Sequence, residues 1–286
     1  MLLPLFRHPY TLTPLHPKPL LTFHYNTLDS TNAAAKRLSA ANPGRVLLVS
    51  AATQTAGRGR LGRVWKSPAG GAWFTLAYPA PEDPIVAQAA PLAVAAAVVE
   101  VLIETMSNPP LPRAHALTIK WPNDLLLNNR KVCGILCERT LAGSRSSGSA
   151  APSTLILGIG VNANVDPCEL TQGDMRYPAT SLVGETHRRV SVPELIDAAG
   201  RRIAAKMDDL CTHGLNCDVI RTVKRHLAWR GCRVSLTRGS EQLEGVVMGI
   251  DGLGRLLLQT DANVEVINSG EVTTVRAVAE PACLCV

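Results

Sequence analysis

Apolar and polar positions alternate along the chain in blocks that predict an α/β unit followed by a run of short strands. Apolar runs at 46–52, 71–78 and 154–162 have the length of buried strands. In 193–211 apolar residues recur every three or four positions, which predicts an amphipathic helix. The apolar stretch 84–106 is interrupted by Gln, Pro and Glu, which favours a buried helix of a globular protein over a membrane span.

From about residue 226 the pattern changes to short alternating segments separated by turn residues. Four segments predict strands: 232–238, 242–250, 255–260 and 264–275. Such short strands in close succession predict a small β barrel appended to the larger unit. We therefore expect three parts, namely a flexible Pro-rich arm at 1–20, an α/β domain at 21–225 and a β domain at 226–286.

The composition says more about which partners the protein has than about its fold. The 286 residues are 46% hydrophobic and 18% charged, and the net charge of +6 favours anionic partners such as nucleotide phosphates, an acidic protein or nucleic acid, without choosing among them. The eight cysteines are scattered, with no paired CxxC motifs and no His at zinc spacing, so reduced thiols and a cytoplasmic location are expected. Prolines break the apolar N-terminus, which argues against a secretion signal.

The segment 54–65, QTAGRGRLGRVW, carries the most specific chemical pattern. Arg58, Arg60 and Arg63 alternate with glycines that let the backbone approach a ligand, and guanidinium groups suit carboxylate or phosphate. Flexible RNA-binding tracts also alternate Gly and Arg, but this is a single copy between two apolar runs. It predicts one mobile loop, disordered until an anion arrives and orders it.

Two further segments place polar side chains at the ends of regular elements. Asp29-Ser30-Thr31-Asn32 precedes a run of good helix formers, so these residues either only cap the helix or also offer its N-terminus to a ligand. The segment 117–124 is a short apolar strand ending in Lys-Trp-Pro-Asn-Asp. Proline keeps the residue before it extended, which presents the strand's last side chains to a cleft.

Together these motifs resemble the biotin protein ligase family. Four segments carry the resemblance in the family's order: DSTN at 29–32, GRGRxGRxW within 54–65, KWPND at 120–124 and GIGVN at 158–162. The resemblance implies an α+β fold, with a mixed β-sheet catalytic domain related to class II aminoacyl-tRNA synthetases and an SH3-like C-terminal β barrel. It further implies activation of biotin by MgATP to biotinyl-5′-AMP and transfer of biotin to a lysine of a carrier, such as the biotin carboxyl carrier protein of acetyl-CoA carboxylase.

The resemblance also assigns expected roles to residues of this chain. Lys120 is expected to be the main catalytic residue, assisted by Arg58 and Arg60. The expected biotin contacts are Ser30, Thr31, Asn32, Gln54, Arg58, Gly59, Arg60 and Lys120. The expected ATP contacts are Arg58, Arg63, Trp65, Asn123, Lys131 and Asn162, with Asp124 as a candidate Mg²⁺ ligand. The competing interpretations are that Lys120 is a structural lysine in a surface ion pair and that Trp65 is a plain core tryptophan.

Other functions stay open at this point. Lipoate protein ligases and octanoyltransferases share the fold and a catalytic lysine, and a nucleic-acid module would use the basic loop together with the small barrel. Some family members carry an N-terminal helix-turn-helix, but only about 25 residues precede the first motif here, so DNA binding is not expected. A homodimer formed through an exposed sheet edge is compatible with the sequence, although no residue argues for it.

Overall fold

The computed structural model describes residues 20–81, 83–107, 115–140, 153–170, 178–238 and 240–274. The expected arm before residue 20, the Ser/Gly insertion at 142–150 and the tail beyond residue 274 lie outside these ranges.

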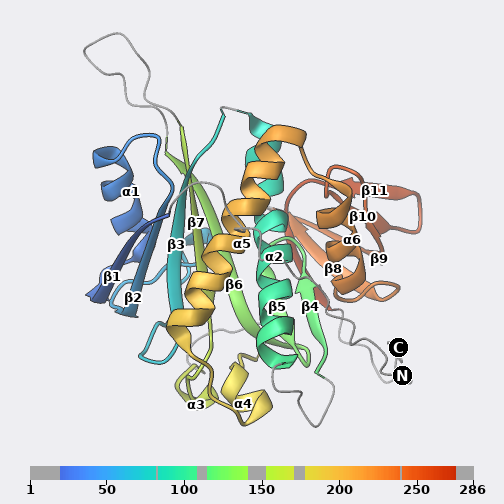
Figure 1. Ribbon diagram of the computed structural model, residues 1–286. Helices are drawn as coiled ribbons and strands as arrows, with labels where there is room; N and C mark the ends of the chain where they lie inside the picture. Colours follow the sequence, from blue (N-terminus) through green and yellow to red (C-terminus); the bar gives the residue numbers. More distant parts are fainter. Residues whose placement is uncertain are drawn as a thin grey trace, which may run out of the picture.

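The larger of two sheets is mixed and has seven strands in the order β1-β2-β3-β7-β6-β5-β4 (Figure 1). Strands β1 and β2 are parallel, and every other neighbouring pair is antiparallel. The bounds are β1 Leu21–Leu28, β2 Leu47–Gln54, β3 Ala72–Pro79, β4 Leu117–Lys120, β5 Asp124–Leu127, β6 Arg130–Thr140 and β7 Thr154–Val161. Sequence patterning missed β1 because it is an edge strand with mostly exposed positions.

Helices cover both faces of this sheet. The long helices α2 (Pro84–Ser107) and α5 (Val192–His213) pack side by side on one face, and α6 (Cys217–His226) packs against α2 (Figure 1). Helix α1 (Thr31–Ala41) packs on the other face, against Leu47 and Val49 of β2. Two short helices, α3 (Pro167–Leu170) and α4 (Leu182–Thr186), follow β7.

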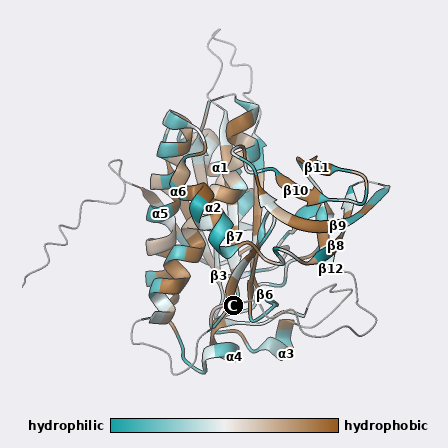
Figure 2. Ribbon diagram, turned by 90° about the vertical axis from the view of Figure 1, so that its right-hand side faces the viewer, coloured by the Kyte–Doolittle hydropathy of each residue, from teal (hydrophilic) through white to brown (hydrophobic). Residues whose placement is uncertain are grey.

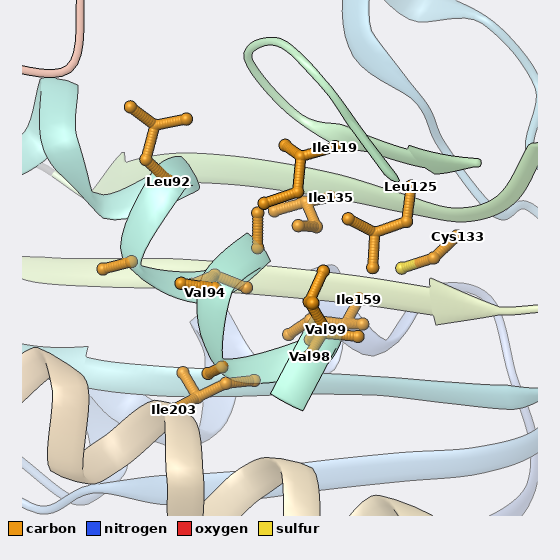
Figure 3. Close-up of a cluster of buried hydrophobic side chains, with 14 of the residues drawn as sticks. Leu92, Val94, Val98, Val99, Ile119, Leu125, Cys133, Ile135, Ile159 and Ile203 are labelled. Atoms are coloured by element: carbon orange, nitrogen blue, oxygen red, sulfur yellow. The ribbon is translucent and has the colours of Figure 1, made fainter. Parts of the chain in front are cut away.

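Strand periodicity explains how one sheet buries two apolar faces. Along β2, Leu47 and Val49 face the α1 cluster while Leu48 joins the larger cluster with α2 and α5. Branched side chains of α2 and the central strands fill this larger core, as Figure 3 shows for Val98, Val99 and Ile159. Small residues of α5 allow close packing, since a Cβ at Gly200 would stand 2.9 Å from Leu48.

Helix α2 is long and apolar enough to cross a membrane by length and composition, but 72% of its apolar window is buried inside the protein. Its apolar character therefore belongs to the core, in contrast to α5, whose polar side faces outward (Figure 2). The expected assignment of 84–106 as a buried helix is thus confirmed.

The second sheet is antiparallel, with five strands in the order β11-β10-β9-β8-β12. Their bounds are β8 Arg233–Arg238, β9 Glu241–Ile250, β10 Leu256–Gln259, β11 Val264–Ile267 and β12 Glu271–Thr274. The expected strand 264–275 is divided in two, because residues 268–270 form a turn that sends β12 across to pair with β8 instead of β10. A separate C-terminal antiparallel sheet is therefore confirmed.

Backbone and side-chain contacts join the two sheets near β4. The indole Nε1 of Trp121 donates to the Gly254 carbonyl at 3.0 Å, and the amide of Ala228 donates to the Ile119 carbonyl at 2.9 Å. Gly254 has φ +76°, and an added Cβ would stand 2.4 Å from Leu92 of α2. The turn before β10 is thus held tightly between β4 and α2.

Replacing Gly254 with alanine should destabilise the protein by about 2 kcal/mol, since the new methyl group would be strained at positive φ and would collide with Leu92. Gly252→Ala is the matched control, because a Cβ at that position meets nothing within 4 Å. Urea unfolding of both variants checks this. Equal free energies of unfolding for the two variants would contradict the tight packing of this turn.

Candidate active site

One cavity of about 440 Å³ opens on the face of the large sheet that also carries α1. Its walls come from the start of α1, the loop 54–65, the end of β4, the middle of β6 and β7, and the beginning of β12. Every predicted site residue except Asn162 lines it: Ser30, Thr31, Asn32, Gln54, Arg58, Gly59, Arg60, Arg63, Trp65, Lys120, Asn123, Asp124 and Lys131. Segments spread over the sequence thus form one site of a size usual for small ligands.

The start of α1 forms a polar end of the cavity. Ser30 is the N-cap of the helix and accepts a hydrogen bond from the Ala33 amide, as the capping interpretation predicted. The Thr31 amide and hydroxyl both lie within hydrogen-bond distance of Gln54 Oε1, at 2.8 and 3.1 Å, and Gln54 Nε2 donates to Ser67 at 2.7 Å. The cap residues therefore both begin the helix and line the cavity.

The loop 54–65 is held against the C-terminal sheet. Arg63 makes two hydrogen bonds to the Glu271 carboxylate, at 2.9 and 2.6 Å. Arg60 donates to the Asn123 side chain at 2.6 Å and to the Gly270 carbonyl at 3.5 Å. The expected ligand-dependent ordering of this loop stays a prediction, and these contacts show what the loop would have to release in order to move.

Trp65 lies flat against the two central strands. A Cβ at Gly160 would stand 2.5 Å from its Nε1 and a Cβ at Gly134 would stand 2.9 Å from its ring, so both glycines make room for the indole. The ammonium of Lys131 lies 5.2 Å from the ring centroid, and Trp73 packs edge-on at 6.3 Å. Trp65 therefore forms a wall of the cavity while also packing on the core.

Two lysines converge on one carboxylate deeper in the cavity. Lys131 Nζ lies 2.7 Å and Lys120 Nζ 3.8 Å from the oxygens of Asp124, whose neighbour Asn123 also donates to it at 3.3 Å. Burial lowers the pKa of Lys120 to about 8, despite the opposing effect of Asp124. Lys120 is 5% exposed and its contact with Asp124 is buried, so the competing interpretation of an ion pair at the surface does not fit this position. Lys131, predicted only as an ATP contact, is equally well placed to meet an anion.

Asn162 lies outside the cavity lining. It is buried at the end of β7, where its Nδ2 donates to the carbonyls of Thr180 at 2.9 Å and Lys131 at 3.4 Å. An ATP contact by Asn162 stays a prediction that this geometry does not favour. Its place suggests a supporting role, since it holds the backbone that carries Lys131.

Sequence reasoning did not assign roles to two acidic residues next to the cavity. Glu271 lines it and binds Arg63, whereas Glu138 accepts hydrogen bonds from Asn32 and Lys36 at 2.7 Å each. No local motif marks Glu138, because its partners are more than 100 positions away in the chain. The described cysteines form no disulfide, and burial raises the pKa of the Cys133 and Cys137 thiols, so neither is an activated nucleophile.

Comparison with known proteins identifies the family. Residues 25–159 match the model of the Biotin/lipoate A/B protein ligase family, and residues 231–273 match the Biotin protein ligase C terminal domain. A Biotin--[acetyl-CoA-carboxylase] ligase of Paracoccus denitrificans is 34% identical over 85% of this chain and 96% of its own length. The chain belongs to the biotin protein ligase family. It is therefore an enzyme of the ligase class.

Further relatives agree with this membership. A Bifunctional ligase/repressor BirA of Bacillus subtilis is 30% identical over 87% of the chain and 72% of its own length. The structure resembles that of a biotin protein ligase from Aquifex aeolicus in complex with biotin and ATP, with TM-score 0.70 and 26% identity over 88% of this chain and 97% of that one. In the present chain, the start of β12 in the C-terminal sheet closes one side of the cavity.

Removing the Glu271 carboxylate should free the arginine loop. Because Glu271→Ala leaves Arg63 without its two hydrogen bonds, we expect trypsin to cleave within 58–63 about threefold faster in the absence of ligand. Asp261→Asn is the matched control, since it weakens an exposed arginine pair on the same sheet, far from the loop. Equal cleavage rates for Glu271→Ala and the wild-type protein would mean that this ion pair does not hold the loop.

Proposed function

We propose that this enzyme activates biotin with ATP and then transfers it to a lysine of a carrier protein. The single observation that carries the proposal is that one cavity combines a neutral polar end at Thr31 and Gln54 with a strongly cationic end. A ureido ring needs neutral donors and acceptors, whereas a carboxylate and a triphosphate need cations. Biotin with ATP presents both kinds of group, and the relative from Aquifex aeolicus binds these two ligands.

In the first half-reaction a biotin carboxylate oxygen attacks the α-phosphorus of ATP. A phosphorus–oxygen bond forms, the bond to the β-phosphate oxygen breaks, and pyrophosphate leaves with the electron pair. Arg58, Arg60 and Arg63 would neutralise the phosphates, while Lys120 and Lys131 would bind the two anions that have to approach each other. These cations act by position and charge, so the enzyme needs no covalent nucleophile.

In the second half-reaction the neutral amine of a carrier lysine attacks the acyl carbon of biotinyl-5′-AMP. An amide bond forms, the amine loses a proton, and AMP leaves. We propose the biotin carboxyl carrier protein of acetyl-CoA carboxylase as the carrier, supported by the printed name of the Paracoccus denitrificans relative.

Asp124 is the carboxylate best placed to hold Mg²⁺. The described residues contain no cluster of three or more acidic, His or Cys side chains, and Mg²⁺ is commonly held by one or two carboxylates together with substrate phosphates. The lining carboxylates are Asp124 and Glu271, and of these Asp124 lies beside Lys120 and Lys131, which fits that pattern. When bound, Mg²⁺ would supply charge neutralisation of the phosphates, and Asp124 would have to exchange its lysine contacts for the ion.

Several finer features belong to the same proposal. We propose that the α/β unit is related to class II aminoacyl-tRNA synthetases and that the C-terminal sheet is an SH3-like barrel. A cytoplasmic location is supported by the free cysteines of the described chain. Homodimerisation through an exposed sheet edge and the absence of DNA binding stay predictions.

Lipoate activation is the second candidate, because the matched family model covers biotin and lipoate ligases together. A long apolar ligand would leave the buried polar groups around Thr31 and Gln54 unpaired, which favours biotin. A nucleic-acid module is less well supported, because it would need several aromatic side chains for base stacking. Among the residues that line the cavity, the aromatic ones are Trp65 and Trp121.

Biotin-dependent exchange of pyrophosphate into ATP tests the first half-reaction, with lipoate and octanoate as parallel substrates. Of the three acids, we expect only biotin to support exchange. The exchange rate should fall about 100-fold or more in Lys120→Met and in Lys131→Met, since each substitution removes a cation beside developing negative charge. Lys66→Met removes a lysine that lies outside this cavity and serves as control. Exchange with lipoate instead of biotin would make the substrate assignment wrong.

The lowered pKa of Lys120 predicts an alkaline limit to activity. Below about pH 8 the ammonium is charged and can bind anions, so kcat/KM for biotin should fall as pH rises through about 8. Lys120→Arg keeps a permanent charge and should lose this alkaline limb even if its activity is lower. If the alkaline fall in kcat/KM persists unchanged in Lys120→Arg, a group other than Lys120 causes it.

A further inference from the structure

Glu138, near the end of β6, lies outside the cavity but contacts a residue that lines it. One carboxylate oxygen, Oε1, accepts a hydrogen bond from Lys36 of α1 at 2.7 Å. The other, Oε2, accepts one from Asn32 Nδ2, also at 2.7 Å. The two oxygens of this carboxylate thus have different partners, and only one of these partners belongs to the cavity.

The carboxamide of Asn32 is held on all sides. Its Nδ2 faces Glu138 and the Leu136 carbonyl, and its Oδ1 lies 2.7 Å from the hydroxyl of the fully buried Thr75. A Cβ at Gly158 would stand 2.2 Å from that Oδ1, so the glycine makes room for the amide to lie flat on β7. Since its polar atoms are already bonded, Asn32 is better suited to transmit an orientation than to bind a ligand.

An ionised carboxylate can only accept hydrogen bonds, and this fixes the direction of the bonds that follow. Glu138 requires the NH₂ group of Asn32, so Asn32 turns its oxygen to Thr75, which must donate to it. Thr75 then has no proton for Thr31, 2.8 Å away. Thr31 donates its single hydroxyl proton to Thr75 or to Gln54 Oε1, so toward a ligand in the cavity that it lines its oxygen can only accept.

We propose that Glu138 is a positioning residue that sets the hydrogen-bonding polarity of the biotin site, making Thr31 an acceptor for an N–H of the ureido ring. The inference rests on the proposed function and adds a specificity determinant to it. Biotin's ureido ring carries two N–H donors, and a pocket hydroxyl restricted to accepting favours such a ligand over one without N–H groups.

The surroundings of Glu138 keep it ionised. Partial burial raises the pKa of the carboxyl group, but hydrogen bonds from Lys36 and Asn32 outweigh it and bring the pKa below its ordinary value. The carboxylate therefore stays acceptor-only at neutral pH. Lys36, a donor-only group, fixes which oxygen is left for Asn32.

The substitution Glu138→Gln reverses this polarity without changing the shape of the side chain. The ammonium of Lys36 would hold the glutamine carbonyl, leaving the glutamine NH₂ to face Asn32 and forcing the Asn32 amide to flip. Thr75 would then donate to the Thr31 hydroxyl oxygen, which would no longer be left to accept from the ligand. We expect biotin to bind about tenfold more weakly to Glu138→Gln by titration calorimetry, with ATP affinity and thermal midpoint unchanged.

A second substitution separates polarity from a structural role. Lys36→Met alone should bind biotin within about twofold of wild type, because Glu138 still accepts from Asn32. In Lys36→Met/Glu138→Gln the glutamine is free to turn its carbonyl to Asn32, so binding should recover to within about threefold of wild type. If Glu138 were only an anchor for α1, the double variant would be weaker than either single variant.

The outcomes distinguish this inference from the function on which it rests. A wild-type protein that does not bind biotin overturns both. With wild-type binding intact, this inference alone is overturned by a Glu138→Gln variant within about twofold of wild type, or by a double variant no tighter than Glu138→Gln.

Discussion

The accumulation of positive charge in one cavity is the constraint around which the rest of the structure is arranged. Arg58, Arg60, Arg63, Lys120 and Lys131 line the cavity, and the lining carboxylates are Asp124 and Glu271. Like charges this close repel one another, and burial of Lys120 adds a desolvation cost that its lowered pKa records. Contacts within the protein offset part of this repulsion, as in the ion pairs of Arg63 with Glu271 and of Lys131 with Asp124.

The C-terminal sheet supplies part of that compensation. Glu271 at the start of β12 binds Arg63, and the neighbouring carbonyl of Gly270 accepts from Arg60. The same sheet is fixed to β4 through Trp121 and Gly254, immediately after Lys120. A movement of the arginine loop therefore has to break contacts with a sheet that is itself anchored beside Lys120, which links the position of the loop to the geometry of this end of the cavity.

The opposite end of the cavity works by hydrogen-bond direction. Thr31, Asn32 and Thr75 are neutral and buried, so their specificity depends on which atoms donate and which accept. Glu138 gives this network an ionised end, and because a carboxylate only accepts, Asn32 has to direct its NH₂ group to Glu138 and its oxygen to Thr75. The cavity thus has two chemically different ends, one with neutral hydrogen-bonding groups and one with a high density of positive charge.

The spacing of apolar residues along the sequence by itself determined the helices 84–106 and 193–211, the buried strands and the separate C-terminal β unit, because the periods of strands and helices can be recognised within a few residues. All of the expected site residues except Asn162 line the cavity, since the arginine loop and the Lys-Trp-Pro-Asn-Asp segment are unusual over a few positions. Only the tertiary structure decided that Lys131 stands beside Lys120 at Asp124, that Asn162 supports the site from outside, and that Glu138 and Glu271 complete it. The contacts of Glu138 and Glu271 join residues far apart in sequence, and the meeting of the two lysines at Asp124 depends on how β4, β5 and β6 pair, which no short window encodes.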